Sequence, residues 1–179
     1  GMHEEGVSAE RVVFTTLHAG GKFDNSAYKT SGGLHGVGSS VVNALSEKMT
    51  VSVGCDGFIY EDRYERGTPV TELTDGLLPA VGTTDWTGTR INFLPDPEIF
   101  EVTRFKEDDV RSRLHETAYL NPALTIEYTD LRVTPAQTCT FREPDGIAGF
   151  IRAMNKGKEP VTDVVYFKGT CENIIVEIA

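Results

Sequence analysis

The first apolar pattern in the chain has the period of an amphipathic helix. Its members recur at spacings of three, four, seven and eight positions: Ala9, Val12, Val13, Thr16 and Leu17. Ser8 is placed to cap the start of this helix, and Gly20 and Gly21 are suited to end it. A second helical pattern, made by three valines and a leucine, predicts another helix over residues 36–47. The polar, glycine-bearing stretch of residues 20–36 between them has a length that in compact domains usually indicates a functional loop.

Alternating apolar and polar positions then predict a meander of antiparallel strands. The first strand ends at Asp56 and Gly57, a pair that strongly indicates a hairpin turn. The next strand carries alternate residues on one face: Phe58, Tyr60, Asp62 and Tyr64. Arg66 and Gly67 suggest a second turn. Residues 74–86 are rich in turn formers, and alternation over residues 89–93 predicts one further strand.

The last third of the chain mixes helical and strand patterns. The stripe of Val110, Leu114 and Ala118 predicts a helix over residues 105–120, which Asn121 and Pro122 end. Strands are expected over residues 124–128 and 138–142, a helix over 147–154, a linker over 156–160, and strands over 164–167 and 174–178. A meander with helices gathered around it predicts an α+β, two-layer sandwich.

Several charged and aromatic side chains of this last third receive a structural interpretation. Opposite charges four residues apart predict the helical ion pairs Glu107 with Arg111 and Asp109 with Arg113. His115 lies on the same charged helix and is expected at the surface. The two aromatic side chains at residues 166 and 167 are expected in the core.

Composition excludes several classes of protein. The chain has 179 residues, enough for one domain or for one domain and part of another. Its net charge of −10 argues against a broad DNA-binding face, because attraction to phosphate dominates such binding. The three cysteines, Cys55, Cys139 and Cys171, are scattered and odd in number, as is typical of reduced thiols in a cytoplasmic protein. We expect no zinc site, no membrane helix and no secretory signal.

The glycine-bearing stretch offers a candidate anion site. Four glycines fall within seven residues, immediately before the second predicted helix: Gly32, Gly33, Gly36 and Gly38. Glycine lets the backbone approach a ligand closely, and the free N–H groups of a helix start attract anions, most often phosphate. Lys22 and Lys29 could add positive charge, and His35 a hydrogen bond. A glycine cluster alone is more often a mobile loop than a phosphate site, and this spacing matches neither the Walker A nor the Rossmann pattern.

Three longer stretches carry a resemblance to a known family. Residues 17–23 read Leu-His-Ala-Gly-Gly-Lys-Phe, residues 31–38 read Ser-Gly-Gly-Leu-His-Gly-Val-Gly, and residues 41–46 read Val-Val-Asn-Ala-Leu-Ser. Together they closely resemble the ATP lid of the ATPase subunits of bacterial type II DNA topoisomerases, the B subunits of gyrase and topoisomerase IV. The resemblance continues more loosely to the C-terminus.

This resemblance implies a fold, a function and partners. The fold would be the GHKL (Bergerat) ATPase fold, a mainly antiparallel mixed sheet layered with helices. Residues 3–157 would form an incomplete ATPase domain, and residues 158–179 the linker and first strands of a transducer domain. The parent protein would bind ATP and Mg²⁺, pair with a second copy of itself and with a DNA-cleaving A-type subunit, and pass one DNA strand through another. It would be cytoplasmic.

The resemblance also implies roles for individual residues. The lid residues that would wrap the triphosphate, largely through backbone N–H groups, are Gly33, Leu34, His35, Gly36, Val37 and Gly38, followed by Ser39. Lys22 matches the lysine that approaches the terminal phosphate, Tyr28 the tyrosine near the adenine, and Thr89 the threonine at the adenine edge. Each also has a plain structural interpretation: a solvated lysine, a tyrosine that anchors a loop, and an ordinary strand threonine. His18, at the end of a helix, is interpreted as structural.

Two departures from the family pattern limit what the chain is expected to do. The family's catalytic carboxylate, magnesium-binding asparagine and adenine-reading aspartate belong to a first helix and an Asp-x-Gly-x-Gly segment, and neither motif occurs in this chain. The chain therefore resembles an N-terminally truncated ATPase domain with no catalytic residue or metal ligand, and we expect no ATP hydrolysis by it. Cys55 also stands where the family usually carries an arginine at the adenine-side mouth.

Two other functions are alternatives to this one. The chain could be a non-catalytic folded module or scaffold with a vestigial ATP lid. The missing motifs favour this alternative, and the three intact stretches that resemble the family's ATP lid argue against it. It could also be another GHKL enzyme, such as a histidine kinase or a chaperone. The same three stretches argue against this alternative as well. The sequence does not decide between a gyrase and a topoisomerase IV subunit, although residues 28–31 slightly favour topoisomerase IV.

Overall fold

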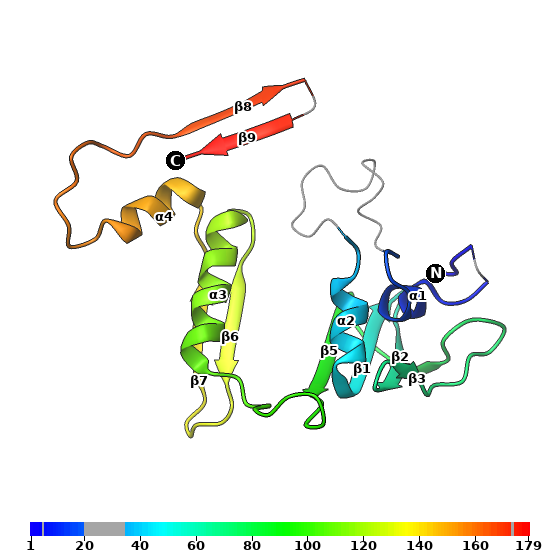
Figure 1. Cartoon of the computed structure of the whole chain (residues 1–179). Coiled ribbons are helices and arrows are strands. Elements are labelled where there is room, and N and C mark those ends of the chain that lie inside the picture. Colours follow the sequence, from blue (N-terminus) through cyan, green and yellow to red (C-terminus); the bar gives the residue numbers. More distant parts are fainter. Residues whose placement is uncertain (5, 20–34, 173) are drawn as a thin grey trace. The chain divides into compact units, whose positions relative to one another are not determined.

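The computed structural model describes residues 1–4, 6–19, 35–172 and 174–179. Its contacts divide the chain into two compact units, Gly1–Thr103 (unit 1) and Arg104–Ala179 (unit 2). Figure 1 labels the elements of both units. The predicted boundary between an ATPase domain and a transducer segment near residue 157 stays a prediction.

Unit 1 is built on a five-stranded antiparallel sheet with the order β3-β2-β1-β5, in which β4 also pairs with β2. Its strands are β1 (Ser46–Cys55), β2 (Phe58–Glu65), β3 (Thr68–Pro69), β4 (Ala80–Thr83) and β5 (Gly88–Pro95). The sequence predicted this meander except for β4, whose short, exposed stretch lies among turn formers and has no clear alternation.

Both predicted tight turns are present. Asp56 and Gly57 connect β1 to β2 with φ angles of 52° and 81°, the left-handed conformation that a two-residue hairpin of this kind needs. Arg66 and Gly67 turn from β2 to β3 with φ angles of 47° and 81°. Aspartate and glycine adopt this conformation readily, so local chemistry explains the first turn.

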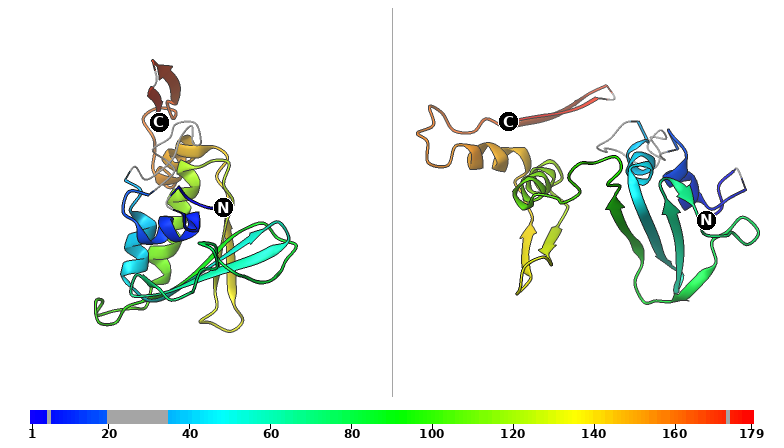
Figure 2. Two further views of the ribbon diagram at one scale, coloured as in Figure 1. Left: turned by 90° about the vertical axis from the view of Figure 1, so that its right-hand side faces the viewer. Right: turned by 60° about the horizontal axis from the view of Figure 1, so that its bottom comes forward.

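Two short helices, α1 (Ala9–Thr15) and α2 (Gly38–Ala44), cover one face of the sheet, as the views in Figure 2 show. Phe14 of α1 packs against Met49, Val51 and Tyr64, which alternate onto that face of β1 and β2. Pairing of Val51 with Asp62 and of Met49 with Tyr64 puts these four strand residues on the same side. The core of unit 1 therefore lies between α1 and the centre of the sheet.

Both helices are shorter than the periodicity predicted. The predicted helix over residues 36–47 ends at Ala44, because Ser46 and Lys48 pair with Pro95 and Leu94 of β5 and so belong to β1. Long-range strand pairing here overrides the helical pattern. Ser8 does precede α1, but its side chain makes no capping hydrogen bond to the described residues.

Unit 2 contains two helices and two hairpins. Its elements are α3 (Glu107–Leu120), β6 (Ile126–Asp130), β7 (Gln137–Phe141), α4 (Gly146–Met154), β8 (Phe167–Cys171) and β9 (Ile174–Ile178). β6 pairs with β7, and β8 pairs with β9, both antiparallel. The rings of Tyr119 on α3 and Phe150 on α4 lie 5.1 Å apart and join the two helices.

Unit 2 corrects two predictions about side chains. His115 is not a free surface residue: its ring stacks between Tyr119 and Phe141, and its Nε2 lies 2.6 Å from Oε1 of Glu143. The aromatic residues at positions 166 and 167 are 47% and 58% exposed, so the prediction that they are core residues is wrong.

The predicted ion pairs of α3 are half right. Glu107 and Arg111 form the predicted pair at 3.0 Å. Arg113 instead pairs with Glu116 at 2.8 Å, in the other direction along the helix from the predicted Asp109. Spacings of three and four are both within reach on a helix, so sequence spacing did not decide between these partners.

Candidate functional site

A hydrogen bond joins the two sides of the glycine-bearing stretch in unit 1. Nδ1 of His18, just after α1, lies 2.8 Å from the backbone oxygen of His35, just before α2. A carbonyl oxygen only accepts, so Nδ1 of His18 carries the hydrogen in this contact. His18 has a φ of 63°, a left-handed conformation that is uncommon outside glycine and that aims its ring at this partner. The residues that flank positions 20–34 are thereby linked.

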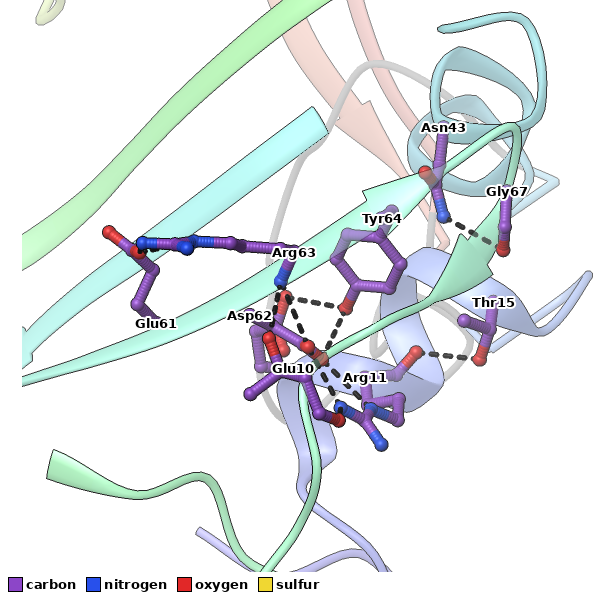
Figure 3. Close-up of polar contacts among 10 residues, drawn as sticks. Glu10, Arg11, Thr15, Asn43, Glu61, Asp62, Arg63, Tyr64 and Gly67 are labelled. Atoms are coloured by element: carbon purple, nitrogen blue, oxygen red, sulfur yellow. Dashed lines mark hydrogen bonds and ion pairs between the residues drawn. The ribbon is translucent and has the colours of Figure 1, made fainter. Parts of the chain in front are cut away.

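The side chain of Asn43 makes a second link between the ends of α1 and α2. Its side chain is 1% exposed, and Nδ2 donates to the backbone oxygen of Phe14 at 3.0 Å and to that of Gly67 at 3.3 Å. Figure 3 shows Asn43 reaching from α2 toward the turn at Gly67. The amide satisfies a carbonyl at the end of α1, where a helix leaves such groups without intrahelical partners. Asn43 belongs to residues 41–46, one of the three stretches that carry the family resemblance, but the sequence alone indicated no role for its side chain.

The start of α2 carries the described part of the predicted phosphate-binding segment. Gly36 has a φ of 60°, and the carbonyl of Val37 accepts hydrogen bonds from Val41 N at 2.9 Å and Ser40 Oγ at 3.0 Å. His35, Gly38 and Ser39 are exposed, whereas Gly36 and Val37 are half-buried. The other predicted members of the segment lie outside the described residues: Lys22, Tyr28, Gly33 and Leu34.

A cavity of about 320 Å³ opens at one end of the unit 1 sheet. It is lined by Gly1, Met2, Ser8, Glu10, Val53, Cys55, Asp56, Tyr60, Leu77 and Leu78. Val53 and Cys55 alternate onto the sheet face that the helices cover, and Thr89 is paired directly with Val53. Directly paired residues share a face, so Thr89 and Cys55, both predicted at the adenine end, lie on the same side of the sheet.

Cys55 is polarised by its neighbour. Its Sγ lies 3.4 Å from Oδ2 of Asp56, and this hydrogen bond raises the pKa of the thiol, with the carboxylate charge adding to the effect. The thiolate is the reactive form of cysteine. Cys55 at the cavity edge is therefore a neutral hydrogen-bond donor at neutral pH, where the family pattern has a cation.

A cluster of polar and charged side chains joins α1 to β2 (Figure 3): Glu10 and Arg11 come from α1, and Asp62 and Tyr64 from β2. Arg11 binds Asp62 through two 2.8 Å hydrogen bonds and donates a third to the backbone oxygen of Thr71 at 2.6 Å. Asp62 is fully buried. Burial, and then the charge of Asp62, raise the pKa of Glu10 to about 8. The alternation of β2 did place Asp62 on an apolar face, a signal that a partner exists, but it did not identify Arg11.

The described residues contain neither a grouped metal site nor a membrane-spanning helix. Nowhere among them do three or more His, Cys, Asp or Glu side chains gather as a potential metal site. None of the helices in this part of the chain has the length and apolarity to cross a membrane.

Comparison with known proteins shows what this arrangement is related to. No family model matches the chain. The chain is 48% identical over 184 residues to the DNA gyrase B subunit of Thermotoga maritima, an alignment that covers 98% of the chain and 28% of that protein. It is 45% identical to the DNA topoisomerase 4 B subunit of Streptococcus pneumoniae, over its whole length and 27% of that protein. The chain thus spans about a quarter of the curated relatives it matches.

A solved structure agrees with these relatives. The 43K ATPase domain of Thermus thermophilus gyrase B, crystallised with an aminocoumarin, matches with a TM-score of 0.76 and 34% identity, over 98% of this chain and 43% of that one. The predicted α+β fold of the GHKL ATPase type is thereby confirmed. The chain is a homologue of the ATPase region of type II topoisomerase B subunits, with gyrase and topoisomerase IV relatives at similar identity.

Proposed function

We propose that this chain works as the lid-bearing part of the ATPase domain of a type II DNA topoisomerase B subunit. The observation that supports this most is the 48% identity to a gyrase B subunit over 98% of the chain, together with the structural match to a gyrase B ATPase domain. This similarity extends over nearly the whole of this chain and over 43% of the matched ATPase-domain chain. A fold match alone would not support a function.

The proposed nucleotide site has two ends in unit 1. The phosphate end is the segment from Gly33 to Ser39, whose backbone N–H groups would bind the phosphates of ATP. Lys22 would approach the terminal phosphate. The base end is the cavity edge near Thr89 and Cys55, with Tyr28 close to the adenine. The cavity of about 320 Å³ has room for a purine and an apolar lining that suits one.

Mg²⁺ is the second cofactor that the relatives suggest. The described residues contain no group of three or more His, Cys, Asp or Glu side chains that could hold it. The two family motifs that would supply a base, a metal ligand and an adenine-reading carboxylate are absent from the chain. We therefore propose that the chain by itself binds nucleotide without hydrolysing it.

The activity of the whole protein follows from the relatives as a proposal. In it, ATP binding would bring two B subunits together and drive strand passage through DNA held by other regions and by the A-type subunit, in the cytoplasm. The net charge of −10 supports DNA being bound elsewhere, because phosphate repels a surface of this sign. A non-catalytic module with a vestigial lid is the second candidate, and the absent motifs favour it.

Calorimetric titration with a non-hydrolysable ATP analogue and Mg²⁺ separates the two candidates. We expect a dissociation constant below about 100 μM, a binding free energy of roughly 5.5 kcal/mol. Lys22→Ala should weaken binding at least tenfold, while the exposed Lys158→Ala should leave it unchanged. A folded chain that gives no heat with the analogue would refute the nucleotide site and favour the vestigial module. Phosphate release from ATP by the purified chain would refute the absence of hydrolysis.

A further inference from the structure

Two carboxyl groups reach the single hydroxyl of Tyr64 (Figure 3). Its Oη lies 2.9 Å from Oε1 of Glu10 and 2.8 Å from Oδ2 of Asp62. A phenolic hydroxyl has one hydrogen and can donate to only one of them. If both carboxyl groups were ionised, one of the two contacts would set two acceptor oxygens against each other at hydrogen-bond distance. One additional proton is therefore needed in this cluster.

The partners of each carboxyl group show where that proton resides. Asp62 accepts two hydrogen bonds from Arg11 and one from the backbone N–H of Arg63, and its side chain is fully buried. Such an ion pair keeps Asp62 charged, so Tyr64 donates to Asp62. Glu10 has no cation of its own, since the Arg11 guanidinium is bound to Asp62 and to the Thr71 carbonyl. Its other oxygen, Oε2, is buried without a hydrogen-bond partner among the described residues.

We propose that Glu10 is held as a neutral carboxylic acid that donates its proton to Tyr64 Oη, and that its ionisation loosens the contact of α1 with the sheet. The chain would thus carry a pH-sensitive contact inside unit 1. This inference does not depend on nucleotide binding. On ionisation Glu10 releases one proton to solvent through the cavity that it lines, and the Glu10–Tyr64 hydrogen bond is lost.

The surroundings of Glu10 agree with this protonation state. Burial first, and the charge of Asp62 second, raise the pKa of Glu10 to about 8. The pKa of Tyr64 is also raised, chiefly by burial, so its hydroxyl keeps its hydrogen. The other titratable groups facing Glu10 are Arg11 on its own helix, Tyr60 on β2, Cys55 and Asp56 across the cavity, and the chain's first residue, Gly1. The cations in this set are Arg11, which is bound to Asp62, and the terminal ammonium of Gly1, which no hydrogen bond among the described residues joins to Glu10.

The direction of the pH effect follows from linkage. A carboxyl group whose pKa is raised in the folded state contributes stability that is complete below its unfolded pKa of about 4.3 and is lost as the pH rises toward 8. Within that window the folded chain holds one proton more than the unfolded chain at this site. The unfolding equilibrium constant should then rise by up to about tenfold per pH unit from this residue.

Glu10→Gln in the 179-residue chain tests the proposal. An amide keeps a neutral donor toward Tyr64 and cannot ionise. Denaturant unfolding between pH 5 and 9 should show the wild-type chain losing stability relative to E10Q by up to about tenfold per unit up to pH 8. The exposed Glu65→Gln on β2 should follow the wild type at every pH. Parallel pH curves for wild type and E10Q would overturn the proposal.

A second measurement keeps the test decisive if E10Q folds poorly. The side-chain carboxyl carbon of Glu10 in the wild-type chain, followed by NMR, should titrate with a midpoint near 8. A midpoint near the ordinary glutamate value of about 4.3 would show that Glu10 is ionised at neutral pH, and the proposal would fail.

Discussion

The side-chain amide of Asn43 donates to the backbone oxygen of Phe14 over 3.0 Å and so ties α2 to the last turn of α1. The two residues lie 29 positions apart in the sequence, on either side of the glycine-bearing stretch. Since the same nitrogen also contacts the carbonyl of Gly67, one buried side chain joins three backbone segments. Asn43 therefore links α2 both to the end of α1 and to the turn at Gly67.

Asn43→Ala is expected to destabilise unit 1 by about 2 kcal/mol, because it leaves one buried and one partly buried carbonyl without their donor. The nearly isosteric Asn43→Asp should cost more, about 3 kcal/mol, since a carboxylate cannot donate and would face two carbonyl oxygens. Denaturant unfolding measures both changes. The exposed Ser39→Ala on the same helix should stay within about 0.5 kcal/mol of wild type. Equal stability of N43D and wild type would contradict the role given to the amide.

Gly67→Ala should be more destabilising than Gly57→Ala. Both glycines have a φ of 81°, so alanine suffers the same backbone strain of about 1 kcal/mol at each turn. A Cβ on Gly67 would lie 3.2 Å from the Cα of Ala44 in α2, whereas a Cβ on Gly57 meets nothing within 4 Å. We expect Gly67→Ala to cost about 1 kcal/mol beyond the matched variant, measured by thermal or denaturant unfolding. Equal costs would show that α2 does not rest on this turn.

Asp56→Asn should make Cys55 more reactive. The hydrogen bond to the Asp56 carboxylate and its charge raise the pKa of the thiol, so removing the charge raises the fraction of thiolate at pH 7.5. Asparagine tolerates the left-handed φ of 52° at this position, so the hairpin should be kept. Alkylation by iodoacetamide, followed by peptide mass spectrometry, should show Cys55 reacting several-fold faster. Cys171 on β8 of unit 2 serves as the internal control, and an unchanged Cys55 rate would refute the prediction.

Asp130→Asn should remove an acid-sensitive part of the stability of unit 2. Hydrogen bonds from the Arg132 side chain, and then from its backbone N–H, hold the pKa of Asp130 at about 2. A depressed carboxyl pKa contributes stability that is present above the unfolded value of about 3.9 and is lost as the pH falls toward 2. The wild-type chain should therefore exceed D130N in stability at pH 6, with the difference shrinking between pH 4 and 2. Asp163→Asn, at an exposed position, should show no such pH-dependent difference.

The sequence predicted where some residues of the candidate site lie in the fold, while their roles toward a nucleotide stay predictions. Of the predicted lid residues, Gly38 and Ser39 begin α2, and His35, Gly36 and Val37 directly precede it; their contact with phosphate stays a prediction. The strand alternation put Thr89 in β5, and the register places it opposite Val53 at the cavity. The charged cluster was not predicted, because Arg11 and Asp62 lie 51 residues apart and nothing local indicates that they meet. The stacking of His115 on aromatic rings was not predicted either. One of these rings, Phe141, comes from β7, and the charged residues around His115 on its helix give no sign of that contact.

The sequence by itself determined the features that depend on neighbours along the chain. Asp56 and Gly57 form their turn because the left-handed backbone is accessible to those residue types, and α3 forms because its apolar stripe and charges have helical spacing. The tertiary structure decided the lengths of α1 and α2, the pairing of β4, and the buried contacts of Asn43 and Asp62. These depend on free energy gained between segments far apart in the sequence, where strand pairing and burial outweigh local preference.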